Sequence, residues 1–194
     1  MKKNRVQNRV KTNLYAQALI DSAKASGGKD EIIQVGKDLE TIKYAVLADS
    51  SLFRVLTDEN LTKSVSEERV LEFVKTSFAG ACESMYEILK VMALNGDAYL
   101  IAHVVDAYHG LIRKQFNIVI ASVTTVVPLD DRLRKLISDK VSGELNCEVS
   151  LFEHIDKKIV GGVIISAAGR VLDCSVLTKL KEMHRQLTRF QVAN

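Results

Sequence analysis

The spacing of apolar residues changes its period near residue 116, and this change constrains the fold more than any other feature of the chain. Before that point apolar residues recur every three or four positions, as in Ile32, Val35 and Leu39, which is the period of an amphipathic helix. After it, residues 118–127 are rich in β-branched side chains, which is typical of a strand. The sequence therefore predicts two regions of different structure.

Residues 1–116 are predicted to form an all-α bundle of five or six helices joined by short links. The glycines of Ser26-Gly27-Gly28 separate the first two helices, and Asn95-Gly96 ends a later one. A short helix or turn is indicated at 52–56, a helix with capping-box spacing begins at Ser64, and the clearest helix spans about 97–114. The residues that we place together on one face of the first helix are Val10, Leu14, Ala18 and Leu19.

Residues 117–194 are predicted to form a small α+β domain with the element order β-α-β-β-β-α. After the first strand, Asp130 or Asp131 can cap a helix that stops near Gly143. Strands are expected at 148–152, 159–166 and 170–172, and the turn Ala167-Ala168-Gly169 joins the last two as a hairpin. A final helix starts near Ser175 and carries an apolar stripe of Val176, Leu180, Met183 and Leu187. The whole chain is thus expected to be α+β, with domains at 1–116 and 117–194.

Charge and composition exclude several classes of protein. The net charge is +3, and neither region has a concentrated basic stripe with interleaved aromatic residues, which argues against nucleic acid as a partner. The longest uncharged run, residues 115–129, is shorter than the roughly 20 residues that span a bilayer. The three cysteines are far apart and form no C-x-x-C pair, so neither a disulfide framework nor a zinc site is predicted. The basic start of the chain is open to three interpretations: a solvated terminus, a phosphate-binding arm or the beginning of a transit peptide.

Sequence patterns for catalysis are missing. Gly161-Gly162 lacks the rest of a phosphate-binding loop and indicates a bulge or a close approach of backbones. His103 and His109 are six residues apart, a spacing that does not suit two metal ligands on one helix. Adjacent acids stand at expected helix starts, where the helix dipole favours negative charge. We therefore predict no catalytic residue, no metal site and no cofactor.

The C-terminal block resembles the δ subunit of F-type ATP synthases, whose mitochondrial counterpart is the oligomycin-sensitivity-conferring protein. The resemblance is carried by an acid, a short spacer, two aliphatic residues and a glycine pair (156–162), followed by a strand, a turn and the start of the last helix (163–176). Tyr15-Ala16-x-Ala18-Leu19 and the segment 123–129 are similar to the family's first helix and to a strand end. Cys174 stands where the family usually has glycine. The residues that match the family signature, to which we assign a structural role, are Asp156, Gly161, Gly162, Asp173 and Ser175.

The resemblance implies a non-catalytic stator subunit. The helical domain would hold the N-terminal segment of an ATP synthase α subunit, the C-terminal domain would hold the peripheral-stalk b subunits, and contact with the membrane would be only indirect. The family pattern begins near residue 8, which favours the cytoplasmic side of a bacterial inner membrane over an organelle. The first and fifth helices would form the groove for the α subunit, and its candidate residues are Tyr15, Ala16, Leu19, Ile88 and Met92.

Two alternatives from other classes remain at this point. A helical bundle followed by a small α+β domain, with a basic start and a pI near 8.7, is also compatible with a nucleic-acid-binding module. A helical-bundle enzyme would use Cys174 as its nucleophile, since a helix N-terminus can lower the pKa of a thiol. Asp173 and Ser175, which flank this cysteine, are best interpreted as caps of the last helix.

Overall fold

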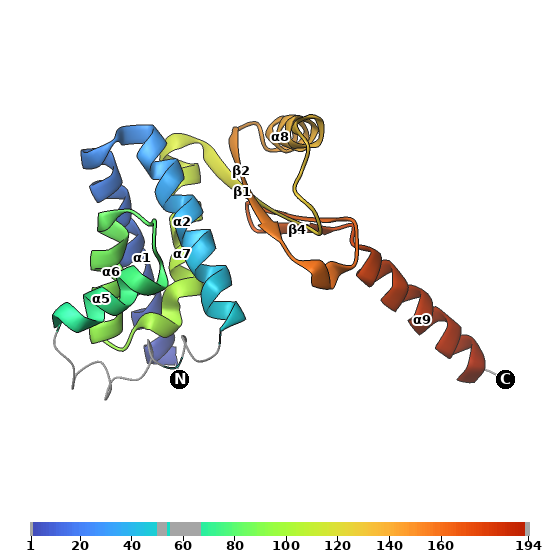
Figure 1. Ribbon diagram of the computed structural model, residues 1–194, viewed down its shortest axis with the longest axis horizontal. Helices are drawn as coiled ribbons and strands as arrows, with labels where there is room; N and C mark the ends of the chain where they lie inside the picture. Colours follow the sequence, from blue (N-terminus) through green and yellow to red (C-terminus); the bar gives the residue numbers. More distant parts are fainter. Residues whose placement is uncertain (1, 50–53, 55–66, 193–194) are drawn as a thin grey trace. The chain divides into compact units, whose positions relative to one another are not determined.

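The structure is a computed structural model that describes residues 2–49, 54 and 67–192 (Figure 1). The chain divides into two compact units, residues 1–116 and 117–194. The described secondary-structure elements of the first unit are all helices, and the second unit combines a four-stranded sheet with two α-helices, so the predicted α+β class is confirmed. The expected short helix at 52–56 and the capping box that begins at Ser64 lie outside the described residues.

The described helices of the first unit follow the predicted order. Gly28, with φ of 67°, provides the left-handed residue between the first two helices, and Gly96, with φ of 66°, follows the end of α6. The helix expected at about 97–114 begins as a short 3-10 segment, η1. The bounds are α1 (Lys2–Ser26), α2 (Gly28–Ala48), α5 (Glu67–Ser77), α6 (Glu83–Leu94), η1 (Ala98–Leu100) and α7 (Ile101–Phe116).

The core of the first unit lies among α1, α2, α6 and α7. Tyr108 of α7 is fully buried, and its hydroxyl donates a 2.8 Å hydrogen bond to the backbone oxygen of Ile32 in α2. Burial raises the pKa of Tyr108, so the hydroxyl remains a donor. Tyr108 thus satisfies its polar atom while filling the space between two helices. The largest of the other fully buried side chains are Leu19, Ile20, Ile32, Leu39, Ile42, Met85, Met92 and Ile112.

A buried carboxylate joins α2 to the start of α6. Asp38 accepts hydrogen bonds from the backbone N–H of Cys82 (3.2 Å) and from the side-chain amide of Gln34 (2.8 Å). Burial raises the pKa of Asp38, and these two hydrogen bonds oppose that shift. Cys82 is the N-cap residue of α6 and makes no side-chain cap of its own, so Asp38 supplies the cap from the neighbouring helix.

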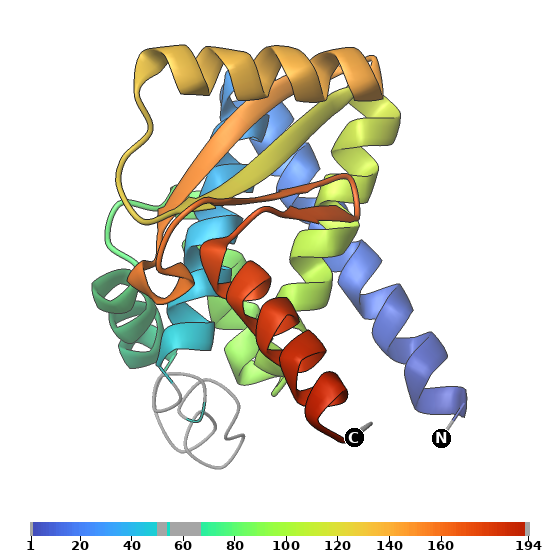
Figure 2. The same ribbon diagram turned by 90° about the vertical axis from the view of Figure 1, so that its right-hand side faces the viewer.

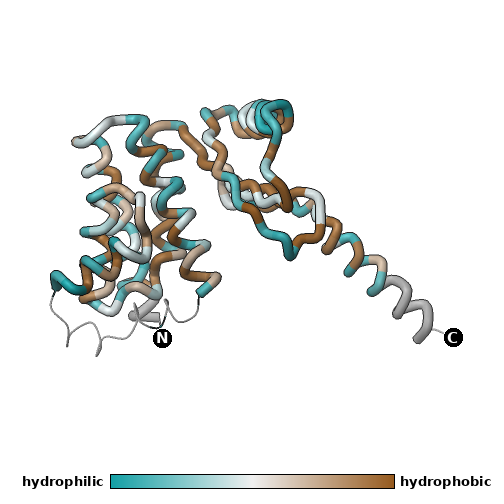
Figure 3. The backbone as a smooth tube through the Cα atoms, viewed as in Figure 1, coloured by the Kyte–Doolittle hydropathy of each residue, from teal (hydrophilic) through white to brown (hydrophobic). Residues whose placement is uncertain are grey.

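The second unit is built around the sheet order β2-β1-β3-β4. Strands β1 and β2 are parallel and are connected by α8, which Figure 2 shows running alongside them, whereas β1–β3 and β3–β4 are antiparallel. Hydrophobic residues are frequent along the strands of this unit (Figure 3). The bounds are β1 (Ile118–Thr125), α8 (Asp131–Leu145), β2 (Glu148–Ile155), η2 (Lys157–Ile159), β3 (Val163–Ala167), β4 (Arg170–Asp173) and α9 (Val176–Val192).

Most predicted features of this unit are confirmed. Asp130 caps α8 by accepting a 2.6 Å hydrogen bond from the N–H of Leu133, and Ala168 with Gly169 forms the left-handed hairpin turn. The helix expected to stop near Gly143 continues two residues further, to Leu145, and is followed by Asn146, whose φ of 49° is left-handed. The strand predicted for 159–166 is wrong in its first part, because the chain turns through η2 before β3 begins at Val163.

We predict that the two units fold separately. Limited proteolysis of the full chain should then cut first near residues 115–117 and release a stable helical fragment of the preceding residues, because the contacts of the chain divide at this point. Mass spectrometry of the early fragments measures the cut positions. First cuts inside α7, between Val104 and Ile112, would contradict this division.

Candidate interaction surfaces

The predicted docking residues of the first unit fall into two groups. Ala16, Leu19 and Met92 are at most 1% exposed, so they belong to the core and present no surface to a partner. Tyr15 and Ile88 are half-buried at the surface. The sequence pattern does not separate these groups, because small and large apolar residues occur on both sides of α1.

Helix α1 has one buried face and one exposed apolar face. Val6, Val10 and Leu14 are 65%, 63% and 68% exposed and lie four residues apart along the helix. The prediction that Leu19 shares a face with Val10 is wrong, because nine residues span about two and a half turns and carry the side chain to the opposite side. The buried face consists of Thr12, Ala16, Leu19, Ile20 and Ala23.

The exposed face of α1 borders a seam with α6. Ser84 of α6 and Asn95, which follows the last residue of α6, hydrogen-bond to Ser22 and Tyr15 of α1, at 2.6 Å and 3.3 Å. Ile88 and Val91 have helical spacing with Ser84 and Asn95, so they lie on the same side of α6. On α1, Leu14 and Ala18 stand beside the residues that contact α6. We call these four apolar residues, Leu14, Ala18, Ile88 and Val91, the α1–α6 seam.

A buried carboxylate fixes the end of this seam. Asp97 is 3% exposed and accepts hydrogen bonds from the ammonium of Lys11 (2.8 and 2.9 Å) and from the hydroxyl of Tyr15 (2.9 Å). The hydrogen bond to Asp97 raises the pKa of Lys11, and burial raises the pKa of Tyr15. Tyr15, predicted as a docking residue, therefore also holds α1 against the turn that follows α6. The sequence offers no signal for this role of Asp97.

On its other side, α1 borders a hollow of about 970 Å³ against η1 and α7. Val6 and Val10 line it from α1, and Tyr99, His103 and Asp106 line it from the opposite wall. Tyr99 is 46% exposed, and its hydroxyl donates a 3.3 Å hydrogen bond to the side chain of Asn8. This mixture of apolar and polar groups suits contact with a polypeptide.

In the second unit, the family-signature residues connect the start of α9 to the loop before β3. The N–H of Val176 donates a 2.9 Å hydrogen bond to the backbone oxygen of Gly161. A Cβ atom on Gly162 would overlap the carbonyl oxygen of Cys174, and the φ of Gly162 is +82°. The predicted close approach of backbones is confirmed, and it explains the glycine at position 162.

The acids and the serine of the signature act as caps. Asp156 accepts a 2.9 Å hydrogen bond from the N–H of Lys158. Asp173 accepts hydrogen bonds from the N–H of Ser175 (2.9 Å) and the hydroxyl of Thr178 (2.8 Å). Hydrogen bonding lowers the pKa of Asp173: the side chain of Ser175 contributes most, followed by the N–H of Ser175 and the side chain of Thr178. The hydroxyl of Ser175 in turn accepts from the N–H of Thr178 at 3.2 Å, which confirms Ser175 as a cap of the last helix.

Cys174 fits the turn at which the resemblance predicts a glycine. It is exposed, it does not belong to the residues of positive φ, and its N–H donates a 2.9 Å hydrogen bond to the oxygen of Val163. No left-handed residue is required at this position, so the cysteine introduces no backbone strain.

The second unit exposes two apolar surfaces. One is a groove of about 620 Å³ between α8 and the strands β3 and β4. Its walls include Leu133 and Leu136 of α8, which are 46% and 56% exposed, and Val171 and Leu172 of β4, which are 68% and 52% exposed. The other is the stripe of α9, where Val176, Leu180 and Met183 are 40%, 53% and 59% exposed. The side chain of Leu187 lies outside the described set.

An ion pair anchors the start of α8 to the sheet. The guanidinium of Arg134 donates hydrogen bonds to both carboxylate oxygens of Glu153 in β2, at 2.6 and 3.2 Å. It also donates to the backbone oxygen of Leu129 (3.2 Å) and to the carboxylate of Asp131 (2.5 Å). Hydrogen bonding to Arg134 lowers the pKa of Glu153. The sequence pattern singles out neither residue, because their pairing joins positions that are 19 residues apart.

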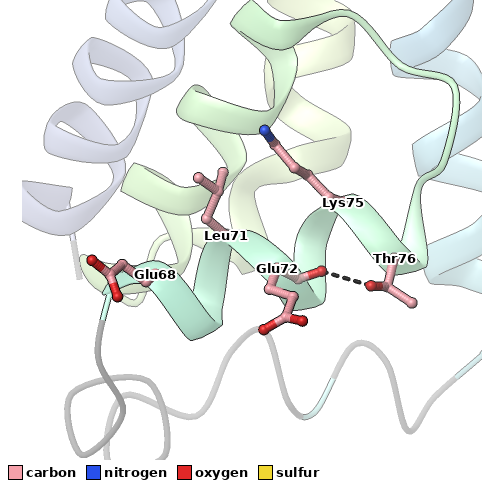
Figure 4. A pocket seen from close by; sticks show the side chains of 5 residues that line it. All are labelled: Glu68, Leu71, Glu72, Lys75 and Thr76. Carbon is pink, nitrogen blue, oxygen red and sulfur yellow. Dashed lines mark hydrogen bonds between the residues drawn. The ribbon is translucent and has the colours of Figure 1, made fainter.

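A small hollow of about 380 Å³ on α5 does not form an enclosed site (Figure 4). Its described lining comes from one face of one helix: Glu68, Leu71, Glu72, Lys75 and Thr76. The hydroxyl of Thr76 donates to the oxygen of Glu72, and the ammonium of Lys75 is 2.7 Å from Glu83. These groups are satisfied within the protein and do not converge on a ligand.

Within the described residues, no cluster of three or more histidine, cysteine, aspartate or glutamate side chains could hold a metal ion. The same part of the chain has no helix with the length and hydrophobicity needed to cross a bilayer.

We expect His109 to make the first unit sensitive to acid. Its Nδ1 lies 3.6 Å from the carboxylate of buried Glu40, which also pairs with Lys43 at 2.7 Å, and its buried Nε2 has no hydrogen-bond partner in the described structure. Burial lowers the pKa of His109; Glu40 and Asp106 oppose this shift, and Lys43 adds to it. The folded state therefore favours the neutral imidazole.

The pH dependence follows from the sign of this shift. A pKa lowered on folding gives stability that is complete above the unfolded pKa of 6.5 and is lost as the pH falls through the folded value. We expect the melting temperature of the wild-type chain to fall more between pH 7.5 and 5.5 than that of the His109→Phe variant, measured by tyrosine fluorescence. Parallel curves for the two proteins would show that His109 does not contribute.

Comparison with known proteins identifies the family to which these surfaces belong. The family model for the ATP synthase delta (OSCP) subunit matches residues 12–187. An ATP synthase subunit delta from Leuconostoc mesenteroides is 31% identical over 176 residues, covering 90% of this chain and 94% of the relative. The same subunit from Clostridium kluyveri is 30% identical over 183 residues, covering 88% and 91%. A solved chain of the Toxoplasma gondii mitochondrial ATP synthase hexamer is 24% identical, with a TM-score of 0.49 and coverage of 91% and 97%.

The described residues form a helical bundle and a small α+β unit, and each unit has exposed apolar side chains. The chain belongs to the ATP synthase delta (OSCP) subunit family. It is a non-catalytic subunit of an F-type ATP synthase, and its partners are other subunits of that complex.

Proposed function

We propose that this subunit is part of the stator of the ATP synthase and links the catalytic head to the peripheral stalk. The observation that carries the proposal is that each of the two units has an exposed apolar surface of its own. Monomeric proteins rarely leave contiguous apolar surface uncovered, and such surface marks contact with partners. A connector that resists the torque of the rotor needs one such contact at each end.

The first unit would bind the N-terminal segment of an α subunit. The support is the α1–α6 seam, where Leu14 and Val91 are 68% and 41% exposed beside half-buried Ile88. An amphipathic helix binds such a surface by placing its apolar face against it. Of the residues predicted to dock, Tyr15 and Ile88 keep this role in the proposal, while Ala16, Leu19 and Met92 support the seam from the core.

The second unit would bind the b subunits through the groove between α8 and the β3–β4 hairpin and through α9. The groove combines apolar walls with a charged rim that includes Lys140, Glu144 and Arg170. An apolar centre surrounded by polar groups is typical of protein interfaces, which supports this role. Because the matched relatives from Leuconostoc and Clostridium are bacterial, we place the complex on the cytoplasmic side of a bacterial inner membrane, with this subunit attached peripherally.

A pull-down from detergent-solubilised membranes tests the proposal. An affinity-tagged copy of the full chain, expressed in its own host, should recover the α and b subunits in a salt-stable complex. Nuclease-treated and untreated samples serve as the control. Recovery of nucleic acid without these subunits would support the alternative of a nucleic-acid-binding module and would contradict the stator role.

A further inference from the structure

Val160 has a backbone conformation that its side chain disfavours. Its φ is +66° and its ψ is −36°, directly after η2, and its N–H donates a 3.2 Å hydrogen bond to the oxygen of Lys157. A β-branched residue at positive φ is a steric outlier, whereas glycine adopts this region freely. The protein therefore maintains a valine at a position that glycine would occupy without strain.

No contact inside the unit explains this valine, because its side chain is 61% exposed. The two positions that follow it have little room for a Cβ atom, which explains their glycines: Gly162 faces the backbone of Cys174, and a Cβ on Gly161 would lie 3.2 Å from Val176. The surrounding turn is fixed from both sides, by buried Ile159 before it and by the hydrogen bond from Val176 to Gly161 after it. Strained residues persist where their surroundings over-determine the conformation, and they cluster at functional positions.

Val160 lies one residue from the point where the chain contacts the start of α9. It precedes Gly161, which contacts Val176, and Val176 begins the exposed series that continues through Leu180 and Met183. We call these four residues, Val160, Val176, Leu180 and Met183, the α9 line.

The charges near the α9 line define what can cover it. Four lysines stand in η2 and α9: Lys157, Lys158, Lys179 and Lys181. Apart from the capping residues Asp156 and Asp173, the acidic residue described in this region is Glu182. Asp173 is already engaged by Ser175 and Thr178. A partner with a complementary surface is an amphipathic helix whose apolar stripe is flanked by aspartate and glutamate.

We propose that Val160 is an anchor of the peripheral-stalk interface, held in a strained turn so that the α9 line can bind an acid-flanked amphipathic helix of the b subunit. This inference rests on the proposed stator function and specifies the residue and the partner chemistry at one end of it. The strain keeps the valine side chain outside the fold, where a partner can bury it.

Three variants of the full chain test the anchor against the extramembrane segment of the b subunit encoded by the same genome. Val160→Ala should weaken binding at least tenfold by titration calorimetry, whereas Val127→Ala, which alters a valine of the same unit that is 66% exposed, should leave it unchanged. Val160→Gly should weaken binding at least as much while leaving the thermal stability equal to or above that of the wild type, because it removes the strain.

The outcomes separate the anchor from the stator function itself. If the wild-type chain does not bind the b segment, the proposed function fails at this end. If it binds and Val160→Gly binds equally well, or if Val160→Gly destabilises the unit, Val160 has no anchor role. Lys181→Glu tests whether the partner is flanked by acidic residues. This variant should bind the b segment more weakly, and its affinity should depend less on salt. An unchanged affinity and an unchanged salt dependence would contradict an acid-flanked partner.

Discussion

Replacing Gly162 with alanine is expected to cost the C-terminal unit about 3 kcal/mol of folding free energy, because a left-handed backbone costs a residue with a Cβ roughly 1–2 kcal/mol and overpacking adds roughly 1–3 kcal/mol. The Cβ would overlap the oxygen of Cys174 and lie 3.1 Å from the Cα of Ser175. The atoms that would have to move are backbone atoms at the start of α9, which cannot give way as a flexible side chain can. The whole connection between the β3 loop and α9 would therefore be strained.

The two units can be followed separately in this experiment. All five tyrosines, at positions 15, 44, 86, 99 and 108, lie in the first unit, so their fluorescence reports on that unit alone. Cys147 is 7% exposed in the second unit, and its alkylation rate, resolved by mass spectrometry, reports on unfolding there. The Gly162→Ala variant should alkylate Cys147 at lower denaturant concentrations, while the tyrosine transition stays in place.

Gly143 provides the matched control. It lies within α8, its φ is not positive, and a Cβ atom added there would meet no atom within 4 Å beyond the adjacent backbone of its own helix. Alanine at this position should stabilise the unit by roughly 0.5–1 kcal/mol. Equal effects of the two substitutions on Cys147 would contradict the account of the glycine pair.

The second large effect is expected at the exposed face of α1. Leu14→Asp should weaken binding of a peptide from the α-subunit N-terminus about 100-fold, or roughly 2.7 kcal/mol, with little change in the melting temperature of the free chain. The reason is that Leu14 is 68% exposed in the free protein, so an aspartate there is penalised when a partner covers it and not before. Fluorescence anisotropy of a labelled peptide measures the affinity.

Two control substitutions show whether Leu14→Asp acts on binding or on folding. Leu19→Ala, at a position 0% exposed, should lose roughly 2–5 kcal/mol of stability and so affect binding through folding. Leu47→Asp, at a position 72% exposed on α2, should alter neither quantity. If Leu14→Asp lowers stability as Leu19→Ala does, or if it leaves the affinity unchanged, the exposed face of α1 is not the docking surface.

The order of elements can be predicted from the sequence because local signals agree with the fold. The glycines between α1 and α2, the cap at Asp130 and the hairpin turn at Ala168-Gly169 each act within a few residues, and each is found at its expected place. The differences arise where a local signal is weak. Gly143 is typical of a helix end in the sequence, but a glycine within a helix is tolerated, and the end is set by the left-handed Asn146.

The interaction surfaces can be predicted only in part, because burial depends on the packing of distant segments. Apolar residues occur on both sides of α1, so the sequence does not indicate which side faces the core. As a result, buried Leu19 and Met92 are among the predicted docking residues, whereas exposed Val6 is not. The contacts that fix the surfaces, such as Lys11 with Asp97 and Arg134 with Glu153, join positions 86 and 19 residues apart. The strain at Val160 is a property of the backbone that its residue type does not reveal.

The most direct test of the connector is whether one chain holds both partners at once. A peptide of the α-subunit N-terminus is immobilised on a sensor surface, the full chain is bound to it, and the extramembrane b segment is then added. The account predicts that the b segment binds to the captured chain with the affinity it shows in solution, that Leu14→Asp abolishes the first step, and that Val160→Ala weakens only the second. Displacement of the chain from the peptide by the b segment would show a single shared site and would contradict a link between head and stalk.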